Sequence, residues 1–317
     1  MARLKHMSLV LKRTGLLAFS KKVWFEVGND NLFMLASSLA YAWLFAIFPF
    51  LIFLLSLLPY LPENLKEKAE WQVQHALSDN LPKKADVILD NIKSFMNQPK
   101  SSLLSVGLVI TIWAASGGMS MTMAALDTAY DVENRRPFYK QKSVAILLTI
   151  VVATLILVVL ALLPLGTIAA NFAQAYGTGW FEKWGWDIRL LSPILIGWHI
   201  IRFSLSFLLL FLVLAILYHY GTAARTRFHL LSPGAVFCVV VWLLLGAVFR
   251  FYVDKFGKYE KTYGTVGGVA ILLLFFYIDA LVLLTGAEIN SEIDNEVEAA
   301  RLEDVHQNVT DATPNPT

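Results

Sequence analysis

The chain has 317 residues, of which 57% are hydrophobic and only 16% are charged. Soluble globular domains carry about 25% charged residues, so this composition indicates an integral membrane protein. The net charge of +2 is too close to zero to indicate a nucleic-acid partner, and the single cysteine, Cys238, excludes an internal disulfide and a cysteine-based metal site.

Residues 1–30 form a basic arm. This segment contains six lysine and arginine residues and no pattern of a cleavable signal peptide. Apolar residues such as Leu16 and Trp24 would allow part of it to lie on the membrane surface. Because the basic residues are spread around the helical wheel, however, we expect a solvated cytoplasmic arm.

Six long apolar stretches follow, each near the roughly 20 residues that a helix needs to cross the hydrocarbon core. They cover residues 32–58, 103–125, 144–170, 190–218, 233–252 and 265–289. Pro49 and Pro164 are candidate kinks in the first and third stretches. The sequence therefore predicts an all-α polytopic fold of six transmembrane helices, in a membrane domain that covers residues 31–290.

Lysine and arginine counts predict the orientation of these helices. With the N-terminus inside, the short inside segments carry 13 basic residues and the short outside loops carry five. This asymmetry predicts that both termini are cytoplasmic, including the acidic tail at 291–317, which we expect to be helical at first and then disordered. The long outside segment, 59–102, has two amphipathic patterns at 63–77 and 82–96. We interpret them as helices that cap the outer face, with a binding lid as the alternative.

Charged residues inside a predicted span are candidates for a functional site. Arg202 and His199 lie three residues apart in the fourth span, and Asp279 lies near the middle of the sixth. Arg202 and Asp279 have depths that differ by about 3 Å at 1.5 Å per residue, so we predict that they interact. The pair would either fix helix packing or form a polar site on a transport route, and the usual role of intramembrane charge favours the second.

Two clusters of small residues are candidates for helix packing or hinge motion. The second span has a stripe of serines and glycines, typical of close helix contact. The sixth span begins with three glycines, which would suit close packing, a hinge or a re-entrant entry. The candidate residues are Ser116, Gly117, Gly118, Ser120, Gly264, Gly267 and Gly268.

Enzyme motifs are absent from the sequence. The six histidines are scattered without metal-ligand spacing, and there is no phosphate-binding loop or nucleophile motif. We therefore expect no catalytic residue, no cofactor and no metal site.

Short motifs follow one another in a characteristic order from about residue 30 to residue 292. They include Trp113-Ala114-Ala115-Ser116-Gly117-Gly118 and Gly286-Ala287-Glu288-Ile289-Asn290. Their main residues are Pro49, Trp113, Tyr130, Pro233, Gly234, Tyr263, Gly286, Glu288 and Asn290. In this order and spacing, the motifs resemble those of the YihY/BrkB family of bacterial inner-membrane proteins, once labelled ribonuclease BN.

The resemblance implies a six-helix bacterial inner-membrane protein in a family without an established activity. Some members look linked to the export of envelope lipid or lipopolysaccharide, and the ribonuclease label has no support in these residues. The leading hypothesis is therefore a transporter-like facilitator of lipid or lipopolysaccharide-precursor export, and anionic headgroups would suit Arg202. The alternatives are a non-catalytic scaffold for envelope assembly and, last, a membrane enzyme. The expected partners are the bilayer and anionic envelope lipids but no nucleic acid, and a homo-oligomer is compatible with the sequence.

A cavity or its absence would separate the first two hypotheses. A membrane-embedded cavity lined by Arg202 and Asp279 would favour the transporter. A solid core in which that pair is buried and satisfied would favour the scaffold.

Overall fold

The computed structural model describes residues 7, 10, 14–57, 101–183, 191–224, 226–256 and 260–312, with side chains in most of these ranges. The expected outer helices at 63–77 and 82–96 lie outside the described residues. The described part contains helices and no strand: α2 (Leu16–Asn29), α3 (Leu32–Leu57), α6 (Ser101–Ala129), α7 (Phe138–Lys183), α8 (Leu191–Ile216), the π-helix η3 (Leu217–Gly221), α9 (Pro233–Phe256) and α10 (Glu260–Ala312).

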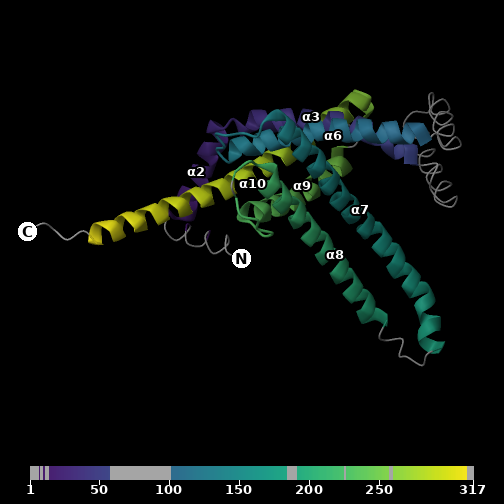
Figure 1. Cartoon of the computed structure of the whole chain (residues 1–317). Helices are drawn as coiled ribbons and strands as arrows, with labels where there is room; N and C mark the ends of the chain where they lie inside the picture. Colours follow the sequence, from purple (N-terminus) through teal and green to yellow (C-terminus); the bar gives the residue numbers. More distant parts are fainter. Residues whose placement is uncertain are drawn as a thin grey trace, which may run out of the picture.

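Six of these helices are long and apolar enough to cross a membrane, so the predicted all-α, six-helix fold is confirmed. The orientation of the termini stays a prediction. Helix α3 packs against α6 and α10, α9 packs against α10, and α6 packs against α7. Helices α7 and α8 pair with each other and run away from the rest of the bundle (Figure 1).

Local chemistry explains several helix ends. Asn31 and Asp131 have positive φ angles of 52° and 50°, and they stand where α2 gives way to α3 and where α6 ends. Asparagine and aspartate tolerate this left-handed conformation better than most residues. Helix α9 begins at Pro233, which suits a first helical turn, and the Ser232 hydroxyl accepts a hydrogen bond from the Ala235 N–H at 3.2 Å.

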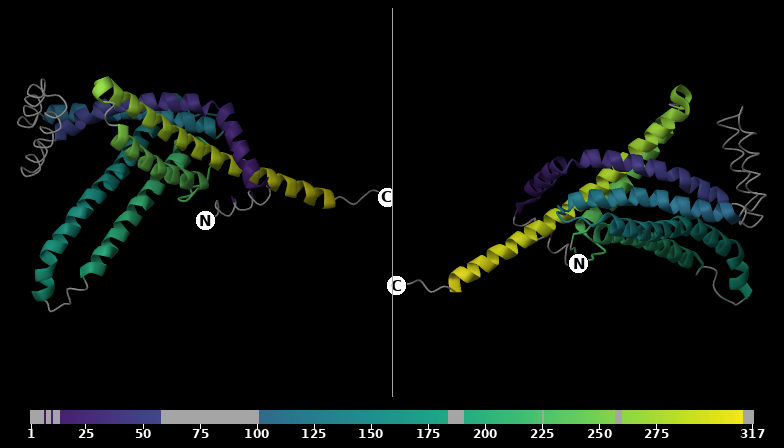
Figure 2. Two further views of the ribbon diagram at one scale, coloured as in Figure 1. Left: turned by 180° about the vertical axis from the view of Figure 1, so that it is seen from behind. Right: turned by 45° about the horizontal axis from the view of Figure 1, so that its top comes forward.

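Two helices extend well beyond the predicted spans. Helix α7 has 46 residues, which is roughly 69 Å of helix, more than twice the thickness of a bilayer core. Helix α10 has 53 residues and continues through the acidic tail as far as Ala312. It crosses the whole bundle and projects beyond it (Figure 2). Gly264, Gly267 and Gly268 lie inside this continuous helix, and Gly268 has no neighbour where a Cβ would stand.

The buried core lies at one end of the bundle. It joins the start of α3, the end of α6, the end of α8 with η3, the start of α9 and the middle of α10. We call this region the packed end. Away from it, the spans expose large apolar side chains such as Leu160, Ile200 and Leu244, as surfaces that face lipid do.

Helix α2 corrects the expectation of a solvated arm. Phe19, Val23 and Val27 recur every fourth residue and are all buried, because this face of α2 packs at the packed end against α10 and α3. The opposite side exposes Leu17, Trp24 and Phe25. The arm is thus part of the fold from Leu16 onward.

Candidate functional site

Most of the buried polar side chains gather at the packed end. Each of them is 4% exposed or less, and they come from the end of α6, the segments next to η3 and α9, and the middle of α10. They are Asp127, Thr222, Ser232, Glu288, Asn290, Ser291 and Glu292. Buried polar groups need hydrogen-bond partners, so this end of the bundle is the candidate functional site.

The contact between α9 and α10 is a crossing of two glycines. A Cβ on Gly234 would stand 1.8 Å from the carbonyl oxygen of Gly286, and a Cβ on Gly286 would stand 2.4 Å from the Cys238 sulfur. Only glycine fits at such a close approach of two backbones. Asn290 then joins the helices, because its Oδ1 accepts from the Gly234 N–H at 3.0 Å and its Nδ2 donates to Ser232 at 3.1 Å. These contacts give structural roles to the motif residues Gly234, Gly286 and Asn290.

Tyr218 and Cys238 extend this crossing to η3. The Tyr218 hydroxyl donates to the carbonyl of Leu283 at 2.9 Å and lies 3.0 Å from the Cys238 sulfur. The Cys238 thiol lies 3.2 Å from the carbonyl of Val282, to which it donates. Cys238 is therefore a buried residue with a structural role, as the apolar surroundings in the sequence indicate.

Two charged residues clamp the segment that follows η3. Asp127 at the end of α6 accepts from the Thr222 hydroxyl at 3.0 Å and from the Ala223 N–H at 2.6 Å. Arg136 donates to the carbonyls of Tyr220 and Thr222 at 3.0 and 2.6 Å. Single π-turns are frequent at functional positions, and this one is fixed from two sides. Sequence reasoning missed both the π-turn and Arg136, because neither has a signal in the hydrophobic pattern.

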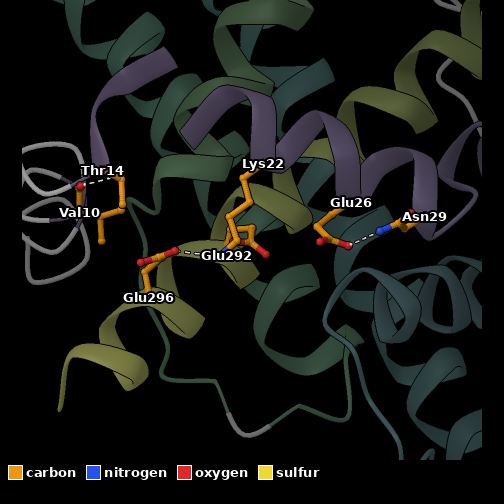
Figure 3. A network of polar contacts seen from close by, with 7 residues as sticks. All are labelled: Val10, Thr14, Lys22, Glu26, Asn29, Glu292 and Glu296. Carbon is orange, nitrogen blue, oxygen red and sulfur yellow. Dashed lines mark hydrogen bonds and ion pairs between the residues drawn. The ribbon is translucent and has the colours of Figure 1, made fainter. Parts of the chain in front are cut away.

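Acidic residues from three segments converge beside this clamp. Lys22 of α2 lies 2.8 Å from both Glu292 and Glu296 of α10, and the three side chains point toward one another (Figure 3). Burial lowers the pKa of Lys22, but the hydrogen bonds and negative charges of the two glutamates outweigh it, so the pKa lies above its usual value. Burial, followed by the charges of Asp131 and Glu26, raises the pKa of Asp30 to about 6.

Arg202, His199 and Asp279 occupy different parts of the bundle. Arg202 is 6% exposed on α8, with its guanidinium 4.9 Å from the Phe203 ring, and Asp279 is half-buried on α10. No ion pair joins Arg202 to Asp279 in the part of the chain that the structure describes. The helices that pack most closely on α8 are α7 and α9, whereas those on α10 are α3, α9 and α6. His199 is half-buried on α8.

The small residues of α6 fall on different faces. Gly118 faces α3, where a Cβ would meet the Trp43 ring at 3.5 Å, whereas Gly117 is exposed. Ser116 donates to the carbonyl of its own helix at Trp113, and Ser120 does the same to Ser116, at 2.8 and 2.7 Å. The Trp113 ring is exposed and carries the Lys142 ammonium 4.4 Å from its centre.

Two other motif residues, Pro49 and Tyr130, take part in contacts between helices. The Pro49 carbonyl accepts from the Thr111 hydroxyl at 2.8 Å, which joins α3 to α6. Tyr130 is 8% exposed in the core of the packed end. The side chain of Tyr263 lies outside the described residues. Among the residues that the structure describes, no three His, Cys, Asp or Glu side chains are placed to hold a metal ion.

An apolar groove separates α9 from α10 farther along their length. It has a volume of about 150 Å³ and is lined by Leu245, Val248, Phe249, Ile271, Leu274, Phe275 and Ile278. The Phe249 and Phe275 rings approach each other at 4.8 Å between centroids. Asp279 follows the last lining residue, Ile278, in the chain but is not itself among the residues that line the groove.

The chain is similar in sequence to known proteins over most of its length. The family described as Virulence factor BrkB matches residues 23–310. A Bacillus subtilis protein named "Putative ribonuclease-like protein YfkH" is 33% identical over 81% of this chain and 88% of its own length.

Two proteins named "UPF0761 membrane protein" are more distant. The one from Cronobacter sakazakii is 27% identical over 88% of this chain and 90% of its own length. The one from Tolumonas auensis is 25% identical over 87% and 85%. No solved structure matches the chain. The resemblance seen in the motifs is therefore confirmed, and the chain belongs to the BrkB family of multi-pass membrane proteins, for which no specific activity is established.

Proposed function

We propose that this protein is a transporter-like facilitator that moves an envelope lipid or a lipopolysaccharide precursor across the bacterial inner membrane. The observation that carries the proposal is the apolar groove between α9 and α10. An exposed groove lined only by apolar side chains suits an acyl chain, and ligand sites commonly lie between the helices of a bundle.

Charged side chains within the membrane spans would serve the headgroup of the same lipid. Asp279 follows the groove residue Ile278 in α10, and Arg202 has a buried guanidinium on α8, which packs against α9. Charged side chains within a span are costly and usually mark a route for polar substrates. A guanidinium also binds phosphate well, because its N–H groups match two phosphate oxygens.

A lipid-flipping assay in liposomes tests this proposal. Purified protein is reconstituted with a fluorescent phospholipid, and the rate of transfer between leaflets is measured by chemical quenching. We expect Leu274→Trp, which fills the groove, to slow transfer at least about fivefold. The matched control is Leu157→Trp on the exposed surface of α7, which should leave the rate unchanged. Wild-type protein that moves lipid no faster than empty liposomes would contradict the proposal.

A scaffold for envelope assembly is the second candidate, and the helical tail is the observation that favours it. Helix α10 continues past the membrane domain to Ala312 and projects beyond the bundle. A chain that ends at residue 297 keeps both partners of Lys22. If it flips lipid normally yet fails to complement a null strain, the projecting helix acts as a binding element.

We expect no ribonuclease activity in purified protein, because the sequence lacks a catalytic constellation. Reporters fused after Asn290 should behave as cytoplasmic.

A further inference from the structure

Glu288 is the most completely buried acid of the packed end. It is 1% exposed, on the turn of α10 that follows the Gly234–Gly286 crossing. Within the described part of the chain, no hydrogen-bond partner reaches its Oε2 atom. A carboxylate in such a position would have lost its hydration without a replacement, which is very unfavourable, whereas a protonated carboxyl is neutral.

Among the residues that the structure describes, the charges that act on the Glu288 carboxyl are negative. Glu26 of α2, Asp30 of the following turn, Asp131 after α6 and Glu292 of α10 all act electrostatically on its carboxyl. The cation of α2 at this place, Lys22, is already held by Glu292 and Glu296. The surroundings therefore favour a neutral side chain at position 288.

The acids also differ in how far they are exposed to solvent. Glu288 is buried, Asp30 is half-buried and Asp131 is exposed. The pKa of Asp30 is raised to about 6, which places its protonation within reach of physiological pH. A carboxyl with such a pKa exchanges protons readily with water and with a neighbouring acid.

We propose that Glu288 is a proton-binding site of the packed end, and that Asp30 and Asp131 connect it to the aqueous phase. Chains of acidic side chains in membrane proteins commonly serve as proton relays. The inference deepens the proposed function by naming the ion that would drive lipid movement, so its physiological meaning rests on that function. The site itself can be tested without any transport.

Infrared spectroscopy of the purified protein provides the test, since a protonated carboxyl has a C=O band that a carboxylate lacks. We expect wild-type protein to show such a band at neutral pH, when exposed acids have ionised. Glu288→Gln should remove it. Glu298→Gln, on an exposed position of the same helix, should leave it unchanged. A spectrum without the band, or one that Glu288→Gln does not alter, would overturn the proposal.

Two further measurements cover the case in which Glu288→Gln does not fold. In Asp30→Asn a negative neighbour is lost, so the band assigned to Glu288 should disappear at lower pH than in the wild type. An unchanged titration would count against the proposal.

Replacing choline chloride by sodium chloride should leave the wild-type band intact, and its loss would show that the site binds a metal cation instead of a proton. Because none of these readouts needs transport, a missing band would leave the lipid hypothesis standing.

Discussion

Helices α9 and α10 contact each other in two very different ways along their length. At the start of α9 their backbones touch through Gly234 and Gly286, and Asn290 bonds across the contact. Near Phe249 and Phe275, the same two helices carry bulky side chains and leave a groove of about 150 Å³ between them. Residue size alone explains the change, since glycines allow helices to approach and aromatic rings keep them apart.

The difference assigns distinct roles to the two regions. Steric fit and buried hydrogen bonds both fix the position of α9 relative to α10 at the crossing, so we expect the two helices to keep a single arrangement there. The groove has neither, and apolar contacts without polar partners permit repacking at low cost. A fixed crossing with an adaptable groove is the arrangement expected if the helices splay at one end while they stay joined at the other.

The most direct test of the close packing at the crossing is to add a methyl group there. In Gly286→Ala the new Cβ would meet Cys238, Tyr218 and the Gly234 backbone, all closer than 3 Å. We expect a loss of roughly 3 kcal/mol in the free energy of unfolding, measured by thermal or denaturant unfolding in detergent, because backbone atoms cannot move aside easily.

Gly246→Ala on the same α9 is the matched control. No atom lies within 4 Å of its Cβ position, and alanine is a better helix former, so stability should stay equal or rise slightly. Equal losses in the two variants would mean that the crossing is not close-packed.

A second change tests whether the clamp supports the fixed region. Asp127→Ala leaves the buried Thr222 hydroxyl and the Ala223 N–H without their acceptor. Hydrogen bonds to a charged group contribute about 1.5–3 kcal/mol, so we expect a loss of about 2 kcal/mol in unfolding free energy. Asp127→Asn keeps one acceptor oxygen and should recover most of it. If both variants unfold like the wild type, the clamp does not stabilise the packed end.

The smallest expected effect concerns Asp30 and depends on pH. Its pKa rises from 3.8 in the unfolded chain to about 6 in the folded one, so folding favours the protonated form. The contribution of Asp30 to stability therefore falls as the pH rises from about 4 to 6. At pH 7, Asp30→Asn should be more stable than the wild type by about 1 kcal/mol, after allowance for partial exposure.

Unfolding curves at pH 4.5 and pH 7 would measure this effect of Asp30. The gain should shrink at the lower pH, where the native carboxyl is already protonated. Glu133→Gln, an exposed acid of the neighbouring loop, should show no such dependence. A gain that is the same at both pH values would mean that burial and the neighbouring acids do not raise the pKa of Asp30.

The membrane spans could be predicted because a bilayer imposes one strict requirement, a continuous apolar stretch. Helix ends outside that stretch could not. Lys140 and Lys142 placed the predicted start of the third span at 144, yet α7 begins at Phe138, because a helix continues through charged residues once it has left the hydrocarbon. The same holds for α10 beyond residue 289.

The candidate site was harder to predict, since sequence reveals an isolated charge in an apolar run but not a partner. Arg202 and Asp279 stand out for that reason, and their similar depths suggested a contact. Depth says nothing about which face a side chain occupies. Asp127 and Arg136, by contrast, lie where charges are common, at helix ends, so their interactions became visible only in three dimensions.

The ion pair between α2 and α10 bears on how the protein is made. Lys22 and Glu296 are 274 residues apart, and a ribosome adds about 5–20 residues per second. Once Lys22 has been synthesised, roughly 15–55 s therefore pass before its partner exists. During this interval Phe19, Val23 and Val27 have no α10 to cover them, which makes the nascent arm a candidate for chaperone or membrane-surface binding. Both ion pairs of Lys22 can form only on a chain translated past residue 296, so they are absent from any nascent chain that stops before Glu292.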